Sequence, residues 1–371
     1  MVNERNIINL LRDLVSINSV TGNEKDIINY LKKYLEESGI QVTLQEVENN
    51  RSNLIATTEN GKNALILSGH VDTVDVVEGW LTNPFELTIS NGRAYGLGAL
   101  DMKSGVAILV ELFKELHNRV KNLDLWLVLT VDEEGHSYGM YKFLEEFTKS
   151  NRSKFIGAIF TEPLPGNKIA LVDRAFGRFA VDVKIKIEGG HAALGDYDFS
   201  IDLEKIVKGL RTLNSYRKSS NIGECKYAVS RLEAGGGFLS YPDKVVIRIN
   251  HIAVPPETLD STIREVKEAF ASAGLEVEVT PIRRPTPFLE YFDCSNSFIA
   301  EVFSKFVSER DVALSVFDGN LTAMYGIPTI NIGPTGGNIH KPNEFVELES
   351  IAKVYEILKK GILYIEDLLK Q

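Results

Sequence analysis

The sequence predicts an α/β protein with a mixed sheet, interrupted by a smaller α+β unit. Apolar segments of strand length, such as 64–67 and 125–131, alternate with segments of helical periodicity such as 102–118, an order typical of a sheet covered by helices. From about residue 176 the order becomes strand, helix, strand, strand, helix, strand, and it closes near residue 280. This change indicates a separate α+β domain inserted into a larger one.

The domain boundaries follow from these patterns. With 371 residues, of which 44% are hydrophobic, the chain is long enough to form two cores. We expect residues 1–174 and 281–371 to form the larger domain and residues 175–280 to form the inserted one. A group of prolines from Pro281 onward marks the return to the larger domain.

Composition excludes several functional classes. The net charge of −10 argues against a binder of nucleic acid or of anionic membranes, and no run of about 18 apolar residues occurs. The glycine patterns that bind nucleotides are missing. The two cysteines, Cys225 and Cys294, lie far apart, which fits a reducing compartment and argues against a structural zinc site built on thiolates. We therefore expect a cytoplasmic protein that acts on small molecules or short peptides, with no nucleic-acid or membrane partner.

Residues that can bind metals or transfer protons follow several predicted strands. His70 and Asp72 end one strand and point to the same side, because side chains alternate along a strand. Taken alone, this pair is equally compatible with a strand end whose side chains bond each other or water. The other groups of this kind are Asp101, Glu133 with Glu134, Glu162, and His340. Because the ends of mostly parallel strands gather at one sheet edge, we expect these groups to converge.

Two imidazoles and several carboxylates suit a pair of divalent ions at roughly 3.5 to 4 Å separation, with zinc expected first and cobalt or manganese as alternatives. Asp101, on a glycine-rich loop, has the short side chain that a bridge between two ions requires. Asp72 suits a position behind His70, where it accepts the other ring N–H. Adjacent acids such as Glu133 and Glu134 are usually a solvated pair, but at the end of an apolar strand one can bind metal while the other remains a general base.

Several segments occur together in a fixed order. They are Ser-Gly-His-Val-Asp-Thr-Val at 68–74, Gly-Leu-Gly-Ala-Leu-Asp-Met-Lys-Ser-Gly at 96–105, Asp-Glu-Glu-Gly at 132–135, Thr-Glu-Pro at 161–163, and the late His340. In order and spacing, over essentially the whole chain, they resemble the M20 metallopeptidase family, which includes acetylornithine deacetylase, succinyl-diaminopimelate desuccinylase, aminoacylase and glutamate carboxypeptidase.

The resemblance implies a role for each of these residues. The implied ligands are His70, Asp101 and Glu162 for one metal ion, and Glu134, Asp101 and His340 for the other. Glu133 is then the general base, and Asp72 orients His70. The resemblance also implies a cis peptide bond between Asp101 and Met102.

The inserted domain resembles the family's ferredoxin-like lid and dimerisation domain, which implies a homodimer formed through residues 175–280. The stretch Glu-Gly-Gly-His-Ala-Ala at 188–193 resembles one in which a histidine reaches the substrate across the dimer interface. This implies that His191 polarises the tetrahedral intermediate from the other subunit. A lone histidine at a strand end is otherwise a surface residue, and we assign no role to the three remaining histidines, His117, His136 and His251.

The segments that bind substrate in many relatives are changed here. The family's Arg-Gly before the first lid strand is replaced by Phe-Gly-Arg at 176–178, and its Asn-x-(Ile/Val)-Pro segment by Leu-Ser-Tyr-Pro at 239–242. The substrate of a relative therefore does not transfer directly. The candidates for substrate binding are Arg174, Arg178, Arg248, Asn320 and Gly336, of which the last two lie in segments that are equally compatible with ordinary turns.

We expect an amide hydrolase with a dinuclear metal centre that cleaves an N-acyl-amino acid. A deacetylase or deacylase of the acetylornithine or acetyllysine type fits this description, including one whose substrate is linked to a carrier protein. A metallo-carboxypeptidase or a dipeptidase is the alternative within the class. The alternative from another class is a non-catalytic binding protein that keeps the fold, although no expected ligand or base is missing.

Overall fold

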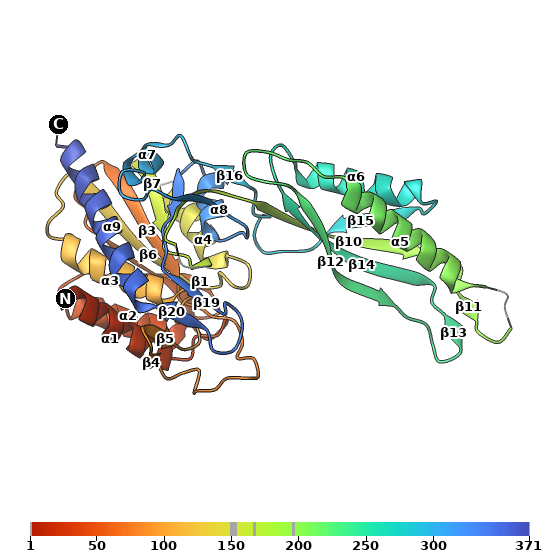
Figure 1. Cartoon of the computed structure of the whole chain (residues 1–371), viewed down its shortest axis with the longest axis horizontal. Helices are drawn as coiled ribbons and strands as arrows, with labels where there is room; N and C mark the ends of the chain where they lie inside the picture. The colour runs from red at the N-terminus through yellow and green to blue at the C-terminus, as the bar shows by residue number, and fades with distance from the viewer. Residues whose placement is uncertain (1, 149–153, 166–167, 195–196, 371) are drawn as a thin grey trace. The chain divides into compact units, whose positions relative to one another are not determined.

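The computed structural model describes residues 2–148, 154–165, 168–194 and 197–370, and its contacts divide the chain into two compact units (Figure 1). Unit 1 comprises Met1–Arg174, Asp293–Val312 and Phe317–Gln371. Unit 2 comprises Ala175–Phe292 and Ala313–Val316.

Unit 1 is built on a mixed sheet, as the sequence predicts. Its strands in spatial order are β1 (Thr43–Glu48), β2 (Arg51–Thr57), β6 (Leu123–Thr130), β3 (Asn63–His70), β7 (Lys154–Phe160), β18 (Thr329–Asn331), β9 (Leu171–Ala175) and β16 (Phe292–Asp293), with β17 (Arg310–Ala313) beside β9. The four central strands β6, β3, β7 and β18 are parallel, whereas β1 with β2, β2 with β6, and β18 with β9 are antiparallel. The parallel centre places the carboxyl ends of β3, β6 and β7 at the same edge.

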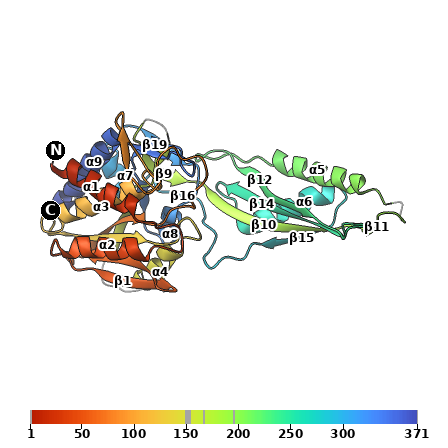
Figure 2. The ribbon, with the colours of Figure 1, turned by 90° about the horizontal axis from the view of Figure 1, so that it is seen from below.

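Helices cover both faces of this sheet. The helices of unit 1 are α1 (Val2–Ser16), α2 (Lys25–Glu36), α3 (Lys103–Leu116), α4 (Tyr138–Phe147), α7 (Phe298–Phe303), α8 (Asp318–Met324) and α9 (Leu348–Leu368). Helix α3 packs between α1 and α9 and against β3 and β6 (Figure 2). All of β6 is buried: Leu125 and Leu127 join the core that includes α3, while Trp126 packs edge-to-face on Phe143 of α4. Burial on both faces explains why β6 is almost continuously apolar.

A smaller sheet in unit 1 connects the segments that contain Asp101 and His340. Its order is β4 (Thr88–Ser90), β5 (Arg93–Tyr95), β20 (Phe345–Glu347), β19 (Thr335–Gly337) and β8 (Leu164–Pro165). Through β5 and β20 it brings the chain before Asp101 next to the chain after His340.

Unit 2 has the predicted order of strand, helix, strand, strand, helix, strand. Its elements are β10 (Gly177–Lys186), α5 (Phe199–Ser215), β12 (Lys226–Ala234), β14 (Lys244–Ala253), α6 (Leu259–Ser272) and β15 (Val277–Pro281), with the short pair β11 (Gly190–His191) and β13 (Ser240–Tyr241). The strands form an antiparallel sheet in the order β12-β14-β10-β15, and α5 and α6 pack together on it. Alternate residues of β14 are buried, so its two faces differ in character.

The second boundary between the units differs from the expected one. We expected the chain to return to the larger domain at residue 281, but residues up to Phe292 stay with unit 2. The Ile282 N–H donates to the Ala180 carbonyl at 3.1 Å, and the Arg178 N–H donates to the Leu289 carbonyl at 2.8 Å. These backbone bonds hold the proline-rich stretch against β10. Among the described residues, no helix is both long and apolar enough to cross a membrane.

Candidate metal centre

The predicted metal ligands and the predicted base meet at the carboxyl edge of the central strands of unit 1. His70 is the last residue of β3, Glu133 and Glu134 follow β6, and Glu162 follows β7. The parallel register pairs His70 with Thr130 on β6, so the ends of these strands are level. Convergence therefore results from strand direction and register, although the residues lie far apart in sequence.

Asp101 lies at the centre of the cluster, and its two carboxylate oxygens face different histidines. Its Oδ1 is 3.2 Å from His70 Nε2, and its Oδ2 is 3.3 Å from His340 Nε2. His70 Nε2 also lies 3.7 Å from Glu162 Oε2, and His340 Nε2 lies 2.9 Å from Glu134 Oε1. Two groups that could each hold a metal ion therefore share Asp101. They contain the same residues as the two ligand sets that the resemblance implies, and the Asp101–Met102 bond is cis, as the resemblance also implies.

The His70 ring is held in one orientation from behind. Its Nδ1–H donates to the backbone carbonyl of Asp72 at 3.0 Å, and Asp72 Oδ1 lies 3.4 Å from the same nitrogen. Because a carbonyl can only accept, Nδ1 carries a proton, and Nε2 is the nitrogen that faces Asp101 and Glu162. Nε2 is therefore the nitrogen available to a metal ion.

Asp72 also fixes the loop that carries the two adjacent glutamates. Its buried carboxylate accepts the backbone N–H groups of Glu133 and Glu134, each at 3.2 Å, and the Thr21 hydroxyl at 2.9 Å. Within the described part of the chain, Asp72 belongs to none of the groups that could hold a metal ion. We expected it to orient His70 only, but it connects the end of β3 to the loop after β6.

The cluster concentrates negative charge in a buried place. Burial raises the pKa of Glu133 well above its ordinary value, and burial also raises the pKa values of Glu134 and Glu162. Burial alone would lower the pKa of His70, but the neighbouring carboxylates, led by Glu162, raise it well above its ordinary value. Hydrogen bonding to Asp101 and Glu134 raises the pKa of His340 to about 10.

One buried oxygen of this cluster, Glu162 Oε1, has no hydrogen-bond partner among the described residues. Two imidazoles cannot balance this many carboxylates without additional positive charge. The donor set of imidazole nitrogens and carboxylate oxygens suits divalent ions such as zinc or manganese. The residues present therefore fit a metal centre.

Glu344 positions the Asp101 loop and was not expected from the sequence. Its buried side chain accepts the backbone N–H groups of Gly98 at 3.0 Å, Leu100 at 2.8 Å and Asp101 at 2.9 Å. Burial raises the pKa of Glu344 to about 7, and these three donors oppose that rise. The sequence did not indicate this role, because the hydrogen bonds join Glu344 to residues 98–101, which lie far from it in the chain.

Arg51 at the start of β2 supports the loop after β6 and was also missed. Its Nη2 donates to Asp132 Oδ1 at 2.9 Å, and its Nε donates to Glu24 Oε2 at 2.8 Å. Asp132, directly before Glu133, has a positive φ of 67°. The Arg51 ion pair holds this uncommon backbone conformation next to the acidic pair.

The three arginine candidates for substrate binding each bond a neighbouring side chain. Arg174 on β9 donates from Nε to Asp173 Oδ1 at 3.1 Å, and Arg178 on β10 donates to Asn250 Oδ1 at 3.2 Å. Arg248 on β14 forms two 2.8 Å hydrogen bonds to the carboxylate of Asp182. This bidentate pair occupies the donors that we expected to bind a substrate carboxylate.

The remaining predicted residues have mainly local contacts. Asn320 is buried in α8, where its Oδ1 accepts the Phe317 N–H at 3.0 Å. Gly336 on β19 packs so closely on the Phe345 carbonyl that a Cβ atom would overlap it. His191 is exposed on β11 in unit 2, where its Nδ1 accepts the Ala193 N–H at 3.1 Å.

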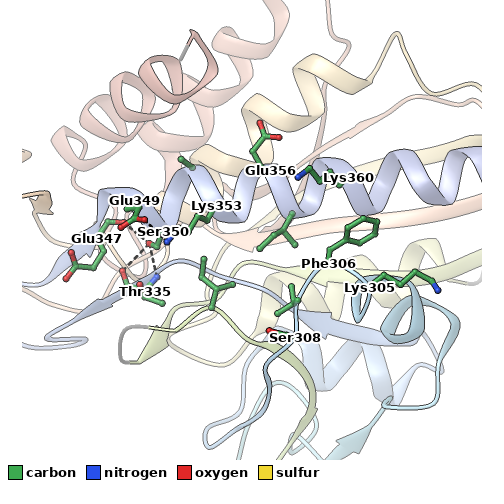
Figure 3. Close-up of a pocket in the computed structure, with 14 residues that line it drawn as sticks. Lys305, Phe306, Ser308, Thr335, Glu347, Glu349, Ser350, Lys353, Glu356 and Lys360 are labelled. Carbon is green, nitrogen blue, oxygen red and sulfur yellow. Dashed lines mark hydrogen bonds and ion pairs between the residues drawn. The ribbon is translucent and has the colours of Figure 1, made fainter.

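A surface cavity of about 1000 Å³ lies elsewhere in unit 1 (Figure 3). Helix α9 lines it with Lys353, Glu356 and Lys360, and the segment after α7 lines it with Lys305 and Phe306. Its described lining contains no histidine and none of the predicted site residues. Size alone therefore does not locate the chemistry of this protein.

Comparisons with known proteins agree with this geometry. The chain is 27% identical to succinyl-diaminopimelate desuccinylase of Sulfurovum sp. (strain NBC37-1), over 97% of this chain and 99% of the relative. It is 26% identical to acetylornithine deacetylase of Aliivibrio fischeri (strain MJ11), over 94% of this chain and 96% of the relative.

Solved structures share the fold over nearly the whole chain. The crystal structure of aminopeptidase PepT from Bacillus cereus ATCC 10987 matches with a TM-score of 0.76 at 21% identity, covering 97% of this chain and 98% of that one. The M20 family metallo-carboxypeptidase Sso-CP2 from Sulfolobus solfataricus matches with a TM-score of 0.74 at 18% identity, covering 96% and 98%. These likenesses confirm the predicted fold class.

The family model described as peptidase family M20/M25/M40 matches residues 66–364, which include every residue of the cluster around Asp101. Members of this family depend on metal ions, and the deacylase relatives act on amide bonds, so the predicted class of metal-dependent amide hydrolase is confirmed. The chain belongs to peptidase family M20/M25/M40.

Proposed function

We propose that this chain is a deacylase that uses two divalent metal ions to hydrolyse an N-acyl-amino acid, and that these ions are zinc. One observation carries the dinuclear part: the two oxygens of Asp101 face His70 Nε2 at 3.2 Å and His340 Nε2 at 3.3 Å. A carboxylate with each oxygen directed to a separate imidazole is suited to bridge two ions. His70, Asp101 and Glu162 would hold one ion, and Asp101, Glu134 and His340 the other.

The protein groups have separate tasks in the proposed reaction. When bound, the ions supply Lewis acidity toward the scissile carbonyl and the attacking water. The Glu133 carboxylate takes a proton from the water and returns it to the nitrogen of the leaving amine. The Asp72 carboxylate holds Glu133 in place through the Glu133 backbone N–H, while the Asp72 carbonyl keeps a proton on His70 Nδ1, so that Nε2 is directed toward the site.

The proposed substrate class rests on the names of the relatives. Both curated relatives described above are named for removing an acyl group from an amino acid. A panel of N-acetyl and N-succinyl amino acids tested beside dipeptides and tripeptides would check this class. We expect the acyl-amino acids to have the higher kcat/KM. Faster turnover of the peptides would contradict the deacylase proposal and favour the peptidase alternative.

The role of Glu133 is tested by Glu133→Gln, which preserves shape but removes the base. We expect bound metal, measured by elemental analysis, to stay at the wild-type level, while kcat falls by about 10²-fold or more. Glu37→Gln, at an exposed glutamate that pairs with Lys33, is a matched control with unchanged turnover. Wild-type kcat in the Glu133→Gln variant would remove Glu133 from the mechanism, whereas a wild-type protein without turnover would support the non-catalytic alternative.

We also propose a homodimer formed through residues 175–280, in which His191 acts at the site of the partner subunit. Its exposed position on β11 leaves the imidazole accessible for this role. Mixing inactive Glu133→Gln with inactive His191→Ala subunits under conditions of exchange should restore activity, because each mixed dimer contains one intact site. If mixing restores no activity while exchange is verified, His191 does not act across subunits.

A further inference from the structure

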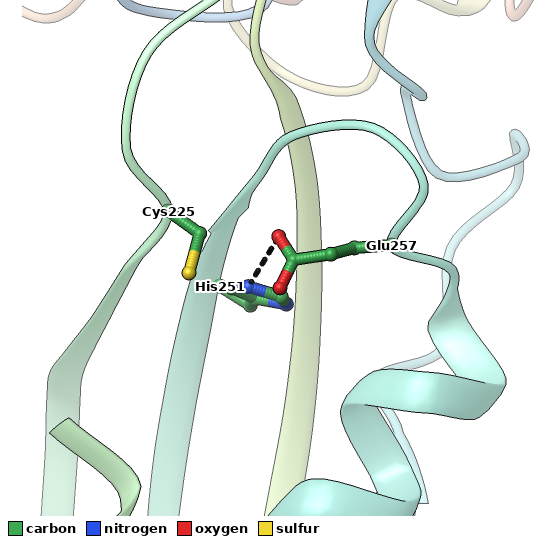
Figure 4. Close-up of side chains that lie close together, drawn as sticks. All are labelled: Cys225, His251 and Glu257. Atoms are coloured by element: carbon green, nitrogen blue, oxygen red, sulfur yellow. Dashed lines mark ion pairs between the residues drawn. The ribbon is translucent and has the colours of Figure 1, made fainter. Parts of the chain in front are cut away.

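Unit 2 contains a second group of metal-binding residue types, far from the strand ends of unit 1 in sequence. Cys225 lies directly before β12, His251 lies on β14, and Glu257 lies directly before the N-cap of α6 (Figure 4). Their exposed fractions are 4%, 0% and 2%. One donor atom from each residue lies within 4.8 Å of the others. Sulfur, imidazole nitrogen and carboxylate oxygen therefore meet in a buried place.

The hydrogen bonds around His251 determine its tautomer. The Thr262 hydroxyl donates to the Thr258 carbonyl at 2.9 Å, so its oxygen is free to accept from His251 Nδ1 at 2.7 Å. Nδ1 therefore carries the proton, and a neutral ring presents the lone pair of Nε2. Tyr227 stacks on the ring with centroids 4.1 Å apart and fixes its plane.

The Nε2 atom of His251 faces a carboxylate that is also buried. Glu257 Oε2 lies 3.2 Å away, and the Val254 N–H donates to that oxygen at 3.0 Å. Among the described residues, neither Nε2 nor Glu257 Oε1 has a hydrogen-bond partner, although Lys218 Nζ lies 3.5 Å from Oε1. A lone pair that faces a carboxylate oxygen is repulsive unless a cation lies between them. That cation is either a proton on the ring or a metal ion.

The geometry suits a metal ion. Zinc ligands at about 2.0 Å to oxygen and about 2.05 Å to nitrogen, at the tetrahedral angle, lie about 3.3 Å apart. The 3.2 Å separation of Nε2 and Oε2 agrees with this value. Cys225 supplies a third donor beside them. Burial raises the pKa of its thiol, so the sulfur is protonated when no cation is present.

We propose that Cys225, His251 and Glu257 bind one zinc-like divalent cation, at a structural site separate from the metal centre of unit 1. Sulfur and nitrogen donors favour zinc over magnesium or calcium, which take oxygen ligands. The ion would connect the segment before β12, the strand β14 and the segment before α6. The two separated cysteines argue against a site built on paired thiolates, whereas the proposed site needs only one thiolate beside a histidine and a glutamate. Lys218, which lies near Glu257 Oε1, is also paired with Glu265.

Cobalt provides a direct test, because a thiolate bound to cobalt(II) gives a charge-transfer absorption that nitrogen and oxygen ligands do not give. Metal-free full-length protein would be titrated with cobalt alone. We expect this absorption in the wild type and in the matched control Cys294→Ser. The Cys225→Ser variant should lack the absorption and should bind one equivalent of cobalt less than the wild type. The ligands proposed for unit 1 include no cysteine, so failure of that centre would not affect this signal. Absence of the absorption in the wild type, or its persistence in Cys225→Ser, would overturn the proposal.

A second measurement uses the unaltered chain and avoids a variant that fails to fold. Alkylation of Cys225 would be compared with that of Cys294 with and without zinc. At a tenfold excess of zinc over its dissociation constant, we expect Cys225 to react about tenfold more slowly while Cys294 is unchanged. Equal slowing of both thiols, or no slowing, would overturn the proposal.

Discussion

The substitution Glu344→Gln tests whether a buried carboxylate positions the metal centre from behind. Glu344 is 2% exposed. Its Oε1 accepts the N–H groups of Leu100 and Asp101, and its Oε2 accepts the N–H of Gly98. Glutamine has nearly the same shape but only one acceptor oxygen. Its carbonyl can retain the two bonds at Oε1, whereas its NH₂ group would face the Gly98 N–H, donor against donor.

The expected cost follows from these bonds. The loss of one hydrogen bond to a charged acceptor costs about 1.5 to 3 kcal/mol, and the two remaining bonds weaken because the acceptor becomes neutral. We expect the free energy of unfolding to fall by about 2 to 4 kcal/mol in total. Because the loop that carries Asp101 loses its anchor, we also expect metal affinity to fall by about 10- to 100-fold.

Urea denaturation and competition with a chromophoric chelator would measure the two effects. Both would be run near pH 8, above the pKa of about 7 to which burial raises Glu344. Glu347→Gln is the matched control, because Glu347 is partly exposed and pairs with Arg93, and it should change stability by less than about 1 kcal/mol. If Glu344→Gln keeps wild-type stability and metal affinity, the three backbone bonds do not position Asp101.

Three further predictions concern other contacts. Asp72→Asn removes a charged acceptor of the Glu133 and Glu134 N–H groups. We therefore expect kcat, measured by steady-state kinetics, to fall by at least about tenfold while the metal stays bound. A wild-type kcat would contradict this expectation. Arg248 lowers the pKa of Asp182, so their partly exposed pair stabilises the fold above about pH 4 and this stabilisation is lost as pH falls below that range. Arg248→Met should therefore cost about 0.5 kcal/mol at pH 7 and progressively less as pH falls below about 4 in urea titrations, with KM unchanged. A raised KM would return Arg248 to the substrate site. Removal of metal with a chelator should lower the free energy of unfolding by about 2.7 kcal/mol for each site filled at 100 times its dissociation constant, and identical urea midpoints would refute a metal centre.

The sequence was sufficient to predict the groups that meet at the strand ends. His70 and the acids after β6 follow apolar runs, and parallel strands place such ends at one edge irrespective of their separation in the chain. The order of strands and helices along the chain in unit 2 could also be predicted, because the alternation of buried and exposed residues along β10 and β14 is a local pattern. Both features depend on periodicity within a short window.

The residues that hold this arrangement could not be predicted in the same way. Arg51 pairs with Asp132, and Glu344 bonds the loop before Asp101, across separations that no local pattern encodes. The boundary at Phe292 was missed for the same reason, because two backbone bonds to β10 decide it. His251 had a usable signal: it continues the inward-facing alternation of β14, which predicts burial. The pattern did not show which side chains would face it.

Two buried carboxylates near the metal centre stabilise its loops in the same way. Asp72 and Glu344 are carboxylates that accept backbone N–H groups of the loops bearing Glu133, Glu134 and Asp101. A carboxylate that bonds a backbone restrains a whole loop, whereas one that bonds a ligand side chain restrains only that side chain. Strand ends therefore bring the ligand types together, and buried acids behind the loops set their orientation. For this reason a family motif identifies the candidate ligands, while the accuracy of their placement depends on residues outside it.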